Sequence, residues 1–385
     1  MMTTDSKRLG LYLHIPFCPR KCLYCDFHSA VADRALQAAY VDALAAALAA
    51  KAPAAEGFTV DTVYIGGGTP TVLPVLDLSR LLRVVRERYT LSPDAEVTVE
   101  CNPATEVEGL FEGLLAAGCN RLSIGLQSAN DRELALLGRA HSFADFERTF
   151  AAARRAGFQN ISVDVMFGIP DGTAESLNTT LQAVIAHAPD HISAYGLRVE
   201  EGTPFFAMRD RLKIADDDAA ADMQLQISKT LCEAGYLHYE VSNYAREGRA
   251  SRHNLRYWTC LPYLGFGAGA HSYFEGERYE TPRSTRSFIA AVREGRFADL
   301  EVGRTAICGK EALDEYVMLH MRLFCGIDKQ QFKNRFGVDF GEVYGSTDRL
   351  VQGGFLIDDK THIAFTEKGM YVSNAILSDW LDFGR

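Results

Sequence analysis

Short runs of aliphatic and β-branched residues alternate with longer amphipathic stretches from residue 10 to about residue 245. This alternation is typical of βα units that build a parallel sheet. The short runs predict six strands, at residues 10–16, 60–65, 95–100, 121–126, 161–167 and 191–197. Apolar residues at helical spacing predict helices between them, at residues 36–48, 78–89, 145–156 and 177–187. We therefore predict an α/β fold whose core is a partial (β/α)6 barrel of the TIM type.

The alternation stops after residue 245, and the chain becomes rich in His, Tyr, Gly and Arg. Further along, the pattern predicts helices at residues 316–324 and 330–336, then a hairpin and a final helix. This order predicts a smaller, mixed α/β C-terminal domain that resembles a winged helix. The predicted organisation is thus a core over residues 1–245, a connecting segment over 246–309 and a C-terminal domain over 310–385.

Polar and glycine residues gather where the predicted strands end. The second strand runs into a GGGTP sequence, and the next strands end near Glu100, Gln127 and Asp164. The carboxyl ends of parallel strands meet at one mouth, where such folds place their chemistry. These scattered positions are therefore expected to form one site.

Composition limits the classes of function. The chain of 385 residues has a net charge of -10, which disfavours nucleic acid as a partner. No apolar run approaches the ~20 residues that would span a bilayer, and the first residues lack the pattern of a secretory signal. We therefore expect a cytoplasmic protein. In that reducing compartment its nine cysteines are not expected to form a disulfide framework.

Three of the cysteines are clustered, at Cys18, Cys22 and Cys25, directly after the first strand. Three thiolates cannot fill a tetrahedral zinc site alone, but they can hold three corners of a [4Fe-4S] cluster. The fourth iron then stays open and can chelate the amino and carboxylate groups of S-adenosylmethionine. A zinc site with His14 or His28 as the fourth ligand is the alternative.

Several motifs together resemble one known family. They are YLHIPFCPRKCLYCDF, GGGTPT, ECNP, RLSIGLQS, LGRAH and SVDVMFGIP, in this order. The chain resembles the radical S-adenosylmethionine (SAM) superfamily, in the branch of the oxygen-independent coproporphyrinogen III oxidases and the heme chaperones of the HemW type. The resemblance implies that the three clustered cysteines hold the [4Fe-4S] cluster. It also implies that SAM is contacted by Tyr12, Gly67, Gly68, Thr69, Glu100, Gln127, Arg139 and Asp164.

Three features separate the two branches. The oxidases have a fourth cysteine where this chain has Phe27, and a long N-terminal extension where only eleven residues precede Tyr12. The HNLRYW stretch at 253–258 also resembles the chaperones. We therefore expect a heme chaperone, with coproporphyrinogen III oxidase as the alternative and a radical enzyme that modifies RNA as a third class. No catalytic residue is assigned, and whether the chain is an enzyme stays open.

Heme binding requires an apolar slot and an axial ligand, for which histidine is common. His253 and His271 are the candidates, and a hydrogen-bonded structural role is the alternative for each. The resemblance implies delivery of heme to respiratory enzymes, and peripheral association with a membrane through those partners. A flavodoxin or ferredoxin would supply electrons if SAM is cleaved. Nucleic acid is not an expected partner, and the oligomeric state stays open.

Overall fold

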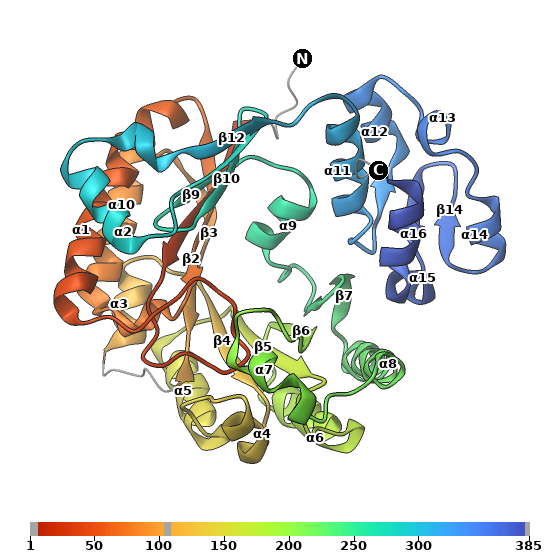
Figure 1. Cartoon of the computed structure of the whole chain (residues 1–385), viewed down its shortest axis with the longest axis horizontal. Helices are drawn as coiled ribbons and strands as arrows, with labels where there is room; N and C mark the ends of the chain where they lie inside the picture. Colours follow the sequence, from red (N-terminus) through yellow and green to blue (C-terminus); the bar gives the residue numbers. More distant parts are fainter. Residues whose placement is uncertain (1–6, 104–108, 382–385) are drawn as a thin grey trace.

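A large sheet organises the chain in the computed structural model, which describes residues 7–103 and 109–381 (Figure 1). Within these residues the sheet has twelve strands in the order β12-β11-β10-β9-β1-β2-β3-β4-β5-β6-β8-β7. The strands from β9 through β1 to β6 run parallel to one another. The strand bounds are β1 Arg8–Ile15, β2 Thr59–Gly67, β3 Leu91–Cys101, β4 Arg121–Gln127, β5 Ile161–Phe167, β6 His191–Gly196, β7 Leu237–Glu240, β8 Asn243–Ala245, β9 Tyr263–Phe266, β10 His271–Phe274, β11 Glu277–Glu280 and β12 Val302–Ala306.

Helices follow most of the parallel strands and cover the outside of the sheet (Figure 1). The helices of this part are α1 Arg34–Lys51, α2 Val75–Arg88, α3 Leu110–Ala116, α4 Asp131–Leu136, α5 Phe143–Ala156, α6 Ala174–Ala186, α7 Pro204–Met208, α8 Asp217–Glu233, α9 Arg252–Trp258 and α10 Thr285–Arg293. All six predicted strands and all four predicted helices of the core are confirmed. The α/β fold with a parallel core sheet, predicted from the alternating pattern, is therefore present.

The two faces of the barrel strands differ in chemistry. In β1, Leu11 and Leu13 are fully buried and join α1 residues such as Leu44 in one apolar core. The alternate positions carry Tyr12 and His14, whose side chains hydrogen-bond to each other at 2.9 Å. Because side chains alternate along a strand, the apolar face packs under the helices and the polar face lines the barrel interior.

Residues 246–309 belong to the same sheet as the barrel. β9 pairs in parallel with β1, and β10, β11 and β12 continue the sheet as antiparallel strands. The sequence pattern predicted only a connecting segment here, because four or five residues are too few to show a strand period. The domain boundary at residue 245 stays a prediction. The pairing of β9 with β1 joins this segment to the barrel sheet.

The C-terminal part has its own sheet and its own core. The sheet order is β13-β15-β14, and Phe332, Phe340 and Phe365 are among the buried side chains that form the core. The elements are α11 Gly309–His320, β13 Ile327–Asp328, α12 Lys329–Phe336, α13 Phe340–Tyr344, α14 Asp348–Gln352, β14 Leu356–Asp358, β15 His362–Phe365, α15 Glu367–Tyr371 and α16 Ser373–Trp380. The predicted hairpin and the flanking helices are confirmed, in an order that fits the winged-helix-like prediction. No helix in the described part of the chain is both long and apolar enough to cross a membrane.

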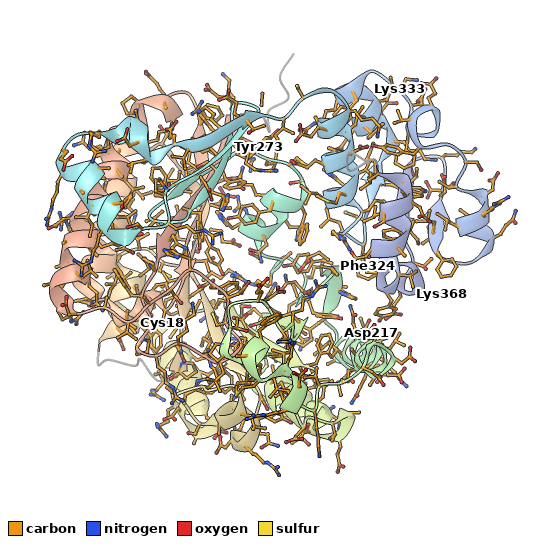
Figure 2. The ribbon with its side chains drawn as sticks, in the orientation of Figure 1. Cys18, Asp217, Tyr273, Phe324, Lys333 and Lys368 are labelled. Carbon is orange, nitrogen blue, oxygen red and sulfur yellow. The ribbon has the colours of Figure 1, made fainter. Side chains whose placement is uncertain are left out.

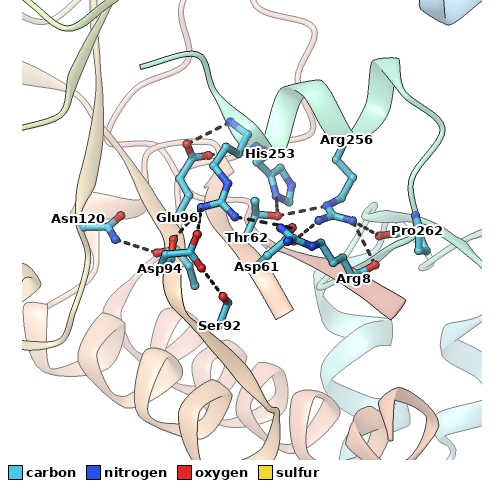
Figure 3. A network of polar contacts seen from close by, with 12 residues as sticks. Arg8, Asp61, Thr62, Ser92, Asp94, Glu96, Asn120, His253, Arg256 and Pro262 are labelled. Carbon is cyan, nitrogen blue, oxygen red and sulfur yellow. Dashed lines mark hydrogen bonds and ion pairs between the residues drawn. The ribbon is translucent and has the colours of Figure 1, made fainter. Parts of the chain in front are cut away.

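Helix α9 carries the HNLRYW sequence and is fixed against the barrel strands by buried charges (Figure 3). Arg256 is 2% exposed, forms an ion pair with Asp61 and donates to the carbonyl oxygen of Pro262 at 3.0 Å. At the start of the helix, the Glu96 carboxylate accepts hydrogen bonds from the backbone N–H groups of Arg252 and His253, both at 3.1 Å. Buried charges are stable only when they are paired in this way, so these contacts hold α9 in one position.

We expect Arg256→Met to lower the free energy of unfolding by about 3 kcal/mol, because it leaves the buried Asp61 carboxylate without its nearest cation. Chemical denaturation measures this change. Replacing both charges, in Arg256→Met with Asp61→Leu, should restore part of the loss. The control Arg148→Met removes an exposed ion pair with Asp145 and should leave the midpoint unchanged. Equal losses of unfolding free energy in Arg256→Met and Arg148→Met would contradict this account of α9.

Candidate functional site

A cavity with a volume of about 290 Å³ lies at the carboxyl ends of the parallel strands, and we call it the cysteine pocket. Each parallel strand from β1 to β6 contributes residues to it, either from its end or from the loop that follows. The predicted site residues that line it are Cys18, Cys22, Cys25, Gly67, Gly68, Thr69, Glu100, Gln127, Arg139 and Asp164. The structure therefore brings ten of the thirteen predicted positions together.

The three thiols lie on a closed loop, residues 16–30, which we call the cysteine loop. It leaves β1 and returns to it, since Ala30 donates to the carbonyl of Pro16 at 2.9 Å and Cys18 donates to the carbonyl of Ala30 at 3.0 Å. Figure 2 labels Cys18 at the start of this loop. All three cysteines are unpaired and partly exposed, so their sulfur atoms are available as ligands.

The glycine run at the end of β2 lets the cysteine loop pack closely. A Cβ atom at Gly68 would stand 2.5 Å from the carbonyl oxygen of Phe17, and Gly67 has a φ of 111°. The N–H groups of Gly68 and Thr69 donate to the carbonyls of Ile15 and Phe17, at 2.9 and 2.7 Å. The N–H groups of Gly68 and Thr69 are therefore already paired inside the chain and are not available to a ligand. A ligand ammonium group would have to bind carbonyl oxygens here.

Two of the three thiols lie beside hydrogen-bond donors of the barrel mouth. The Thr69 hydroxyl points to Cys18 Sγ at 3.6 Å, and Arg139 Nη1 points to Cys22 Sγ at 3.7 Å. Both contacts place a hydrogen-bond donor beside a sulfur atom. Over residues 7–103 and 109–381, no three His, Cys, Asp or Glu side chains are placed to hold one metal ion together. In a cubane each thiolate binds a different iron, so the sulfur atoms need not converge on one point.

Glu100 is a partly buried acid in the lining of the pocket. Its carboxylate accepts hydrogen bonds from Tyr64 Oη at 2.8 Å and from the Gly67 N–H at 2.9 Å. Burial raises the pKa of Glu100 to about 7, and the nearby Asp164 carboxylate adds to this rise. Burial also raises the pKa of Asp164, which accepts from Ser123 Oγ at 3.2 Å. Two partly buried acids facing one cavity favour a cationic ligand, which would stabilise their ionised forms.

Arg139 and Gln127 close the other side of the pocket. Arg139 donates to the Asn102 side chain at 3.2 Å and to the Gly125 carbonyl at 2.5 Å, while its Nε has no partner. Gln127 has a φ of 74°, which is rare for a residue with a side chain, and its amide oxygen accepts from Tyr195 Oη at 2.9 Å. Such a backbone strain at the end of β4 is typical of a functional site. An unpaired guanidinium nitrogen beside it suits a ligand carboxylate.

A second cavity, with a volume of about 560 Å³, adjoins the first, and we call it the chamber. The two cavities share Asp26, Phe27, Gly67 and Glu100 in their linings. Other residues of the chamber come from β1, from the cysteine loop and from the chain after residue 245, namely Tyr12, His28, Tyr257, Tyr263, His271 and Arg283. The sequence pattern did not reveal this chamber, because Tyr263 and Arg283 follow no motif. Tyr263 reaches it through the pairing of β9 with β1, and Arg283 follows β11 further along the same sheet.

Three predicted residues lie outside the cysteine pocket. Tyr12 and His271 line the chamber, where His271 is exposed and lies 3.3 Å from the Glu280 carboxylate. His253 is 1% exposed, and both of its ring nitrogens have partners, Thr62 Oγ1 at 2.9 Å and Tyr257 Oη at 2.8 Å. The geometry therefore gives His253 a packing role in α9, and its prediction as a heme ligand requires one of these bonds to break.

Comparison with known proteins agrees with this geometry. Residues 12–184 match the Radical SAM superfamily, and residues 309–372 match the HemN C-terminal domain. The fold also matches the structure of coproporphyrinogen III oxidase (HemN) from Escherichia coli, with a TM-score of 0.85 and 24% identity over 98% of this chain and 91% of that one. Fold, cysteine loop and superfamily match together define a radical SAM protein, a family that implies a [4Fe-4S] cluster and SAM.

The relatives in sequence are more specific. The heme chaperone HemW of Escherichia coli is 35% identical over 97% of this chain and 98% of its own length. The heme chaperone HemW of Lactococcus lactis is 32% identical over 98% of both chains. The mitochondrial radical S-adenosyl methionine domain-containing protein 1 of the mouse is 34% identical over 97% of this chain and 87% of its own. The chain belongs to the HemW family.

Replacing Cys18, Cys22 or Cys25 by serine should remove most of the iron and of the brown iron-sulfur absorption after anaerobic reconstitution, because we expect each thiolate to bind a separate iron. Iron content per chain and the visible spectrum measure this. Cys232→Ser is the matched control, since Cys232 lies exposed in α8, outside the pocket. Colourless wild-type protein that contains zinc would contradict the cluster.

The pKa of Glu100 predicts a pH dependence of stability. Its pKa in the folded protein is about 7, above the ordinary value of 4.5. Between pH 4.5 and pH 7 the folded protein therefore binds more protons than the unfolded chain, and the free energy of unfolding falls as the pH rises through this range. Glutamine has no such proton to lose. We therefore expect the stability of Glu100→Gln relative to the wild type to rise from about pH 5 to about pH 8 in urea denaturation of the protein without SAM. A Glu100→Gln difference that does not change with pH would argue against the raised pKa of this acid.

Proposed function

We propose that this protein is a heme chaperone that binds heme in the chamber and passes it to heme-dependent proteins. The single observation that carries the proposal is the chamber itself, which opens beside the cysteine pocket and shares four lining residues with it. Relatives that span nearly the whole chain are named heme chaperone HemW, which supports the same assignment.

The walls of the chamber suit a flat, largely apolar ring that carries carboxylates. Tyr257 and Tyr263 pack edge to face with ring centres 4.7 Å apart, and Phe27 is 65% exposed at the opening. Aromatic side chains of this kind can stack on a porphyrin. Arg283 lines the same cavity and is exposed, so its guanidinium is available to a heme propionate. Iron ligation by a histidine would complete the site.

In this proposal the cysteine pocket binds the iron-sulfur cluster and SAM, and not the heme. Cys18, Cys22 and Cys25 would hold a [4Fe-4S] cluster, which would supply the binding site for SAM. Arg139 pairs with the SAM carboxylate, while Glu100 and Asp164 face its positive charges. Gly67, Gly68, Thr69 and Gln127 shape the pocket around it, and Tyr12 supports it from the chamber side. When bound and reduced, the cluster supplies an electron that can cleave SAM, and a flavodoxin or ferredoxin would provide that electron.

The axial ligand of the heme is assigned to the histidines near the chamber. His271 is exposed there and needs only to leave the Glu280 carboxylate. His253 needs α9 to open, because both its ring nitrogens are bonded inside the chain. Each stays a proposed ligand that spectroscopy of variants can test.

Coproporphyrinogen III oxidase is the weaker alternative. The match to the oxidase from Escherichia coli, at 24% identity, reports the fold alone. Phe27 occupies the position where the oxidases carry their fourth cysteine, and it lines both cavities. We also propose that the chaperone works in the cytoplasm, that respiratory enzymes accept its heme, and that it meets the membrane only through them.

The purified, reconstituted protein should bind heme, with a Soret absorption band that differs from free heme, and should transfer it to an apo-acceptor. Incubation with coproporphyrinogen III, SAM and a reductant without oxygen should yield no protoporphyrinogen, because Phe27 stands where the oxidases carry their fourth cysteine. A known oxidase in the same assay is the positive control. Turnover of coproporphyrinogen, or failure to bind heme, would overturn the proposal.

A further inference from the structure

The strands that follow residue 245 continue the wall of the chamber. Tyr263 of β9 lines the chamber and lies opposite Tyr273 of β10, which in turn lies opposite Arg278 of β11. Residues directly opposite each other in neighbouring strands point to the same face of a sheet. The alternate residues Leu264 and Phe274 are buried in the apolar core under the helices. The other three side chains therefore form one row on the inner face, which starts at the chamber and which we call the wall row.

Helix α11, at the start of the C-terminal part, holds the outer end of the wall row. Arg278 Nη1 and Nη2 each lie 2.9 Å from a different carboxylate oxygen of Glu315, so the pair is bidentate. The Glu315 side chain is only 12% exposed, which limits the screening of this pair by solvent. The Arg278 guanidinium also lies 6.0 Å from the ring centre of Tyr273. Because a bidentate pair fixes the direction of a guanidinium as well as its place, Glu315 orients the residue that flanks Tyr273.

The charges of this pair also act on the chamber wall itself. Burial raises the pKa of Tyr263, while the nearby Arg278 lowers it and Glu315 raises it. Tyr263 packs edge to face on Tyr257, and both tyrosines line the chamber. Movement of Arg278 would therefore disturb one of the two rings that are proposed to stack on heme.

The C-terminal part, residues 309–381, is also fixed to the opposite end of the sheet. The Val241 N–H donates to the carbonyl of Arg322, and the Phe324 N–H donates to the carbonyl of Tyr239, both at 3.1 Å. These bonds join β7 and the turn after it to the chain that follows α11. Strand β7 ends the sheet order on one side, and β11 lies next to the last strand on the other. The C-terminal part therefore connects the two ends of the open sheet (Figure 1).

We propose that Glu315 is a positioning residue for the chamber, and that the C-terminal part is a clasp that keeps the chamber wall in place. This inference rests on the proposed heme chaperone function and gives the C-terminal part a role in it. While Glu315 is bonded to Arg278, the wall row is fixed and heme is retained. When this bond is lost, the wall row can shift and heme leaves the chamber faster. No residue of the wall row lines the cysteine pocket, so the effect is confined to the chamber.

The rate of heme loss from the full-length, reconstituted protein tests the inference, measured as transfer of heme to an excess of apomyoglobin. Glu315→Gln should raise this rate by about fivefold, because it removes the charge that holds Arg278, and should leave the iron-sulfur absorption unchanged. Arg278→Glu should also raise the rate, and Glu315→Arg combined with Arg278→Glu should restore most of the wild-type value. Glu311→Gln is the matched control. Glu311 is an exposed acid one turn earlier in α11, with no ion pair among the residues that the structure describes, so this variant should behave as the wild type.

Labelling of Cys260 by a thiol reagent, read by mass spectrometry, reports the clasp without heme. Cys260 is 9% exposed and packs with Tyr316 in the core of the C-terminal part, so the reagent reaches it only when that part moves away. Labelling should be faster in Glu315→Gln than in the wild type and in Glu311→Gln. Equal labelling of the three proteins would contradict the clasp.

The outcomes separate this inference from the proposed function. A wild-type rate of heme loss in Glu315→Gln would overturn Glu315 as a positioning residue and leave the chaperone function standing. Faster heme loss that the reversed pair does not correct would also overturn it, since that result indicates a general loss of packing. Failure of the wild type to bind heme would refute the proposed function, and the labelling rates would then still show whether Glu315 holds the clasp.

Discussion

The close packing of the cysteine loop on the glycine run of β2 is the contact on which the site depends. Gly68 meets the backbone of Phe17 at a distance that leaves no room for a side chain, and Thr69 bonds to the same carbonyl. This contact turns the loop back over the strand ends, so that three thiols face the acids and the arginine of the barrel mouth. Without it, the cysteines would lie on a free loop with no fixed relation to Glu100 or Arg139.

The barrel interior places acidic side chains close together in the site. Alternation along each strand puts leucine, isoleucine and valine under the helices and leaves polar side chains inside, among them Glu100 and Asp164. Burial of two acids is costly when they are ionised, and a bound cation would reduce that cost. The same interior also receives α9, whose buried Arg256 is paired with Asp61. The polar lining therefore serves both ligand binding and the closure of the barrel.

The adjoining cavities suggest how a radical SAM fold can carry a second ligand. Phe27 and Glu100 belong to both linings, so a group in the chamber would lie next to a group in the cysteine pocket. The chamber is lined in part by Tyr263 of β9 and by residues of the chain that follows β9. Strand β9 pairs with β1 on the edge opposite to β2. The additional strands therefore enlarge the mouth of the barrel on the side of β1, beyond the six βα units.

The sequence by itself determined the strands and helices of the core, since hydrophobic period and strand length are local properties. It also located the cysteine pocket, because the carboxyl ends of parallel strands must meet at one edge. Only the tertiary structure decided the surroundings of the candidate histidines: both ring nitrogens of His253 are hydrogen-bonded, and His271 is exposed beside Glu280. These differences arise from partners distant in sequence, such as Thr62, which no local pattern can bring together.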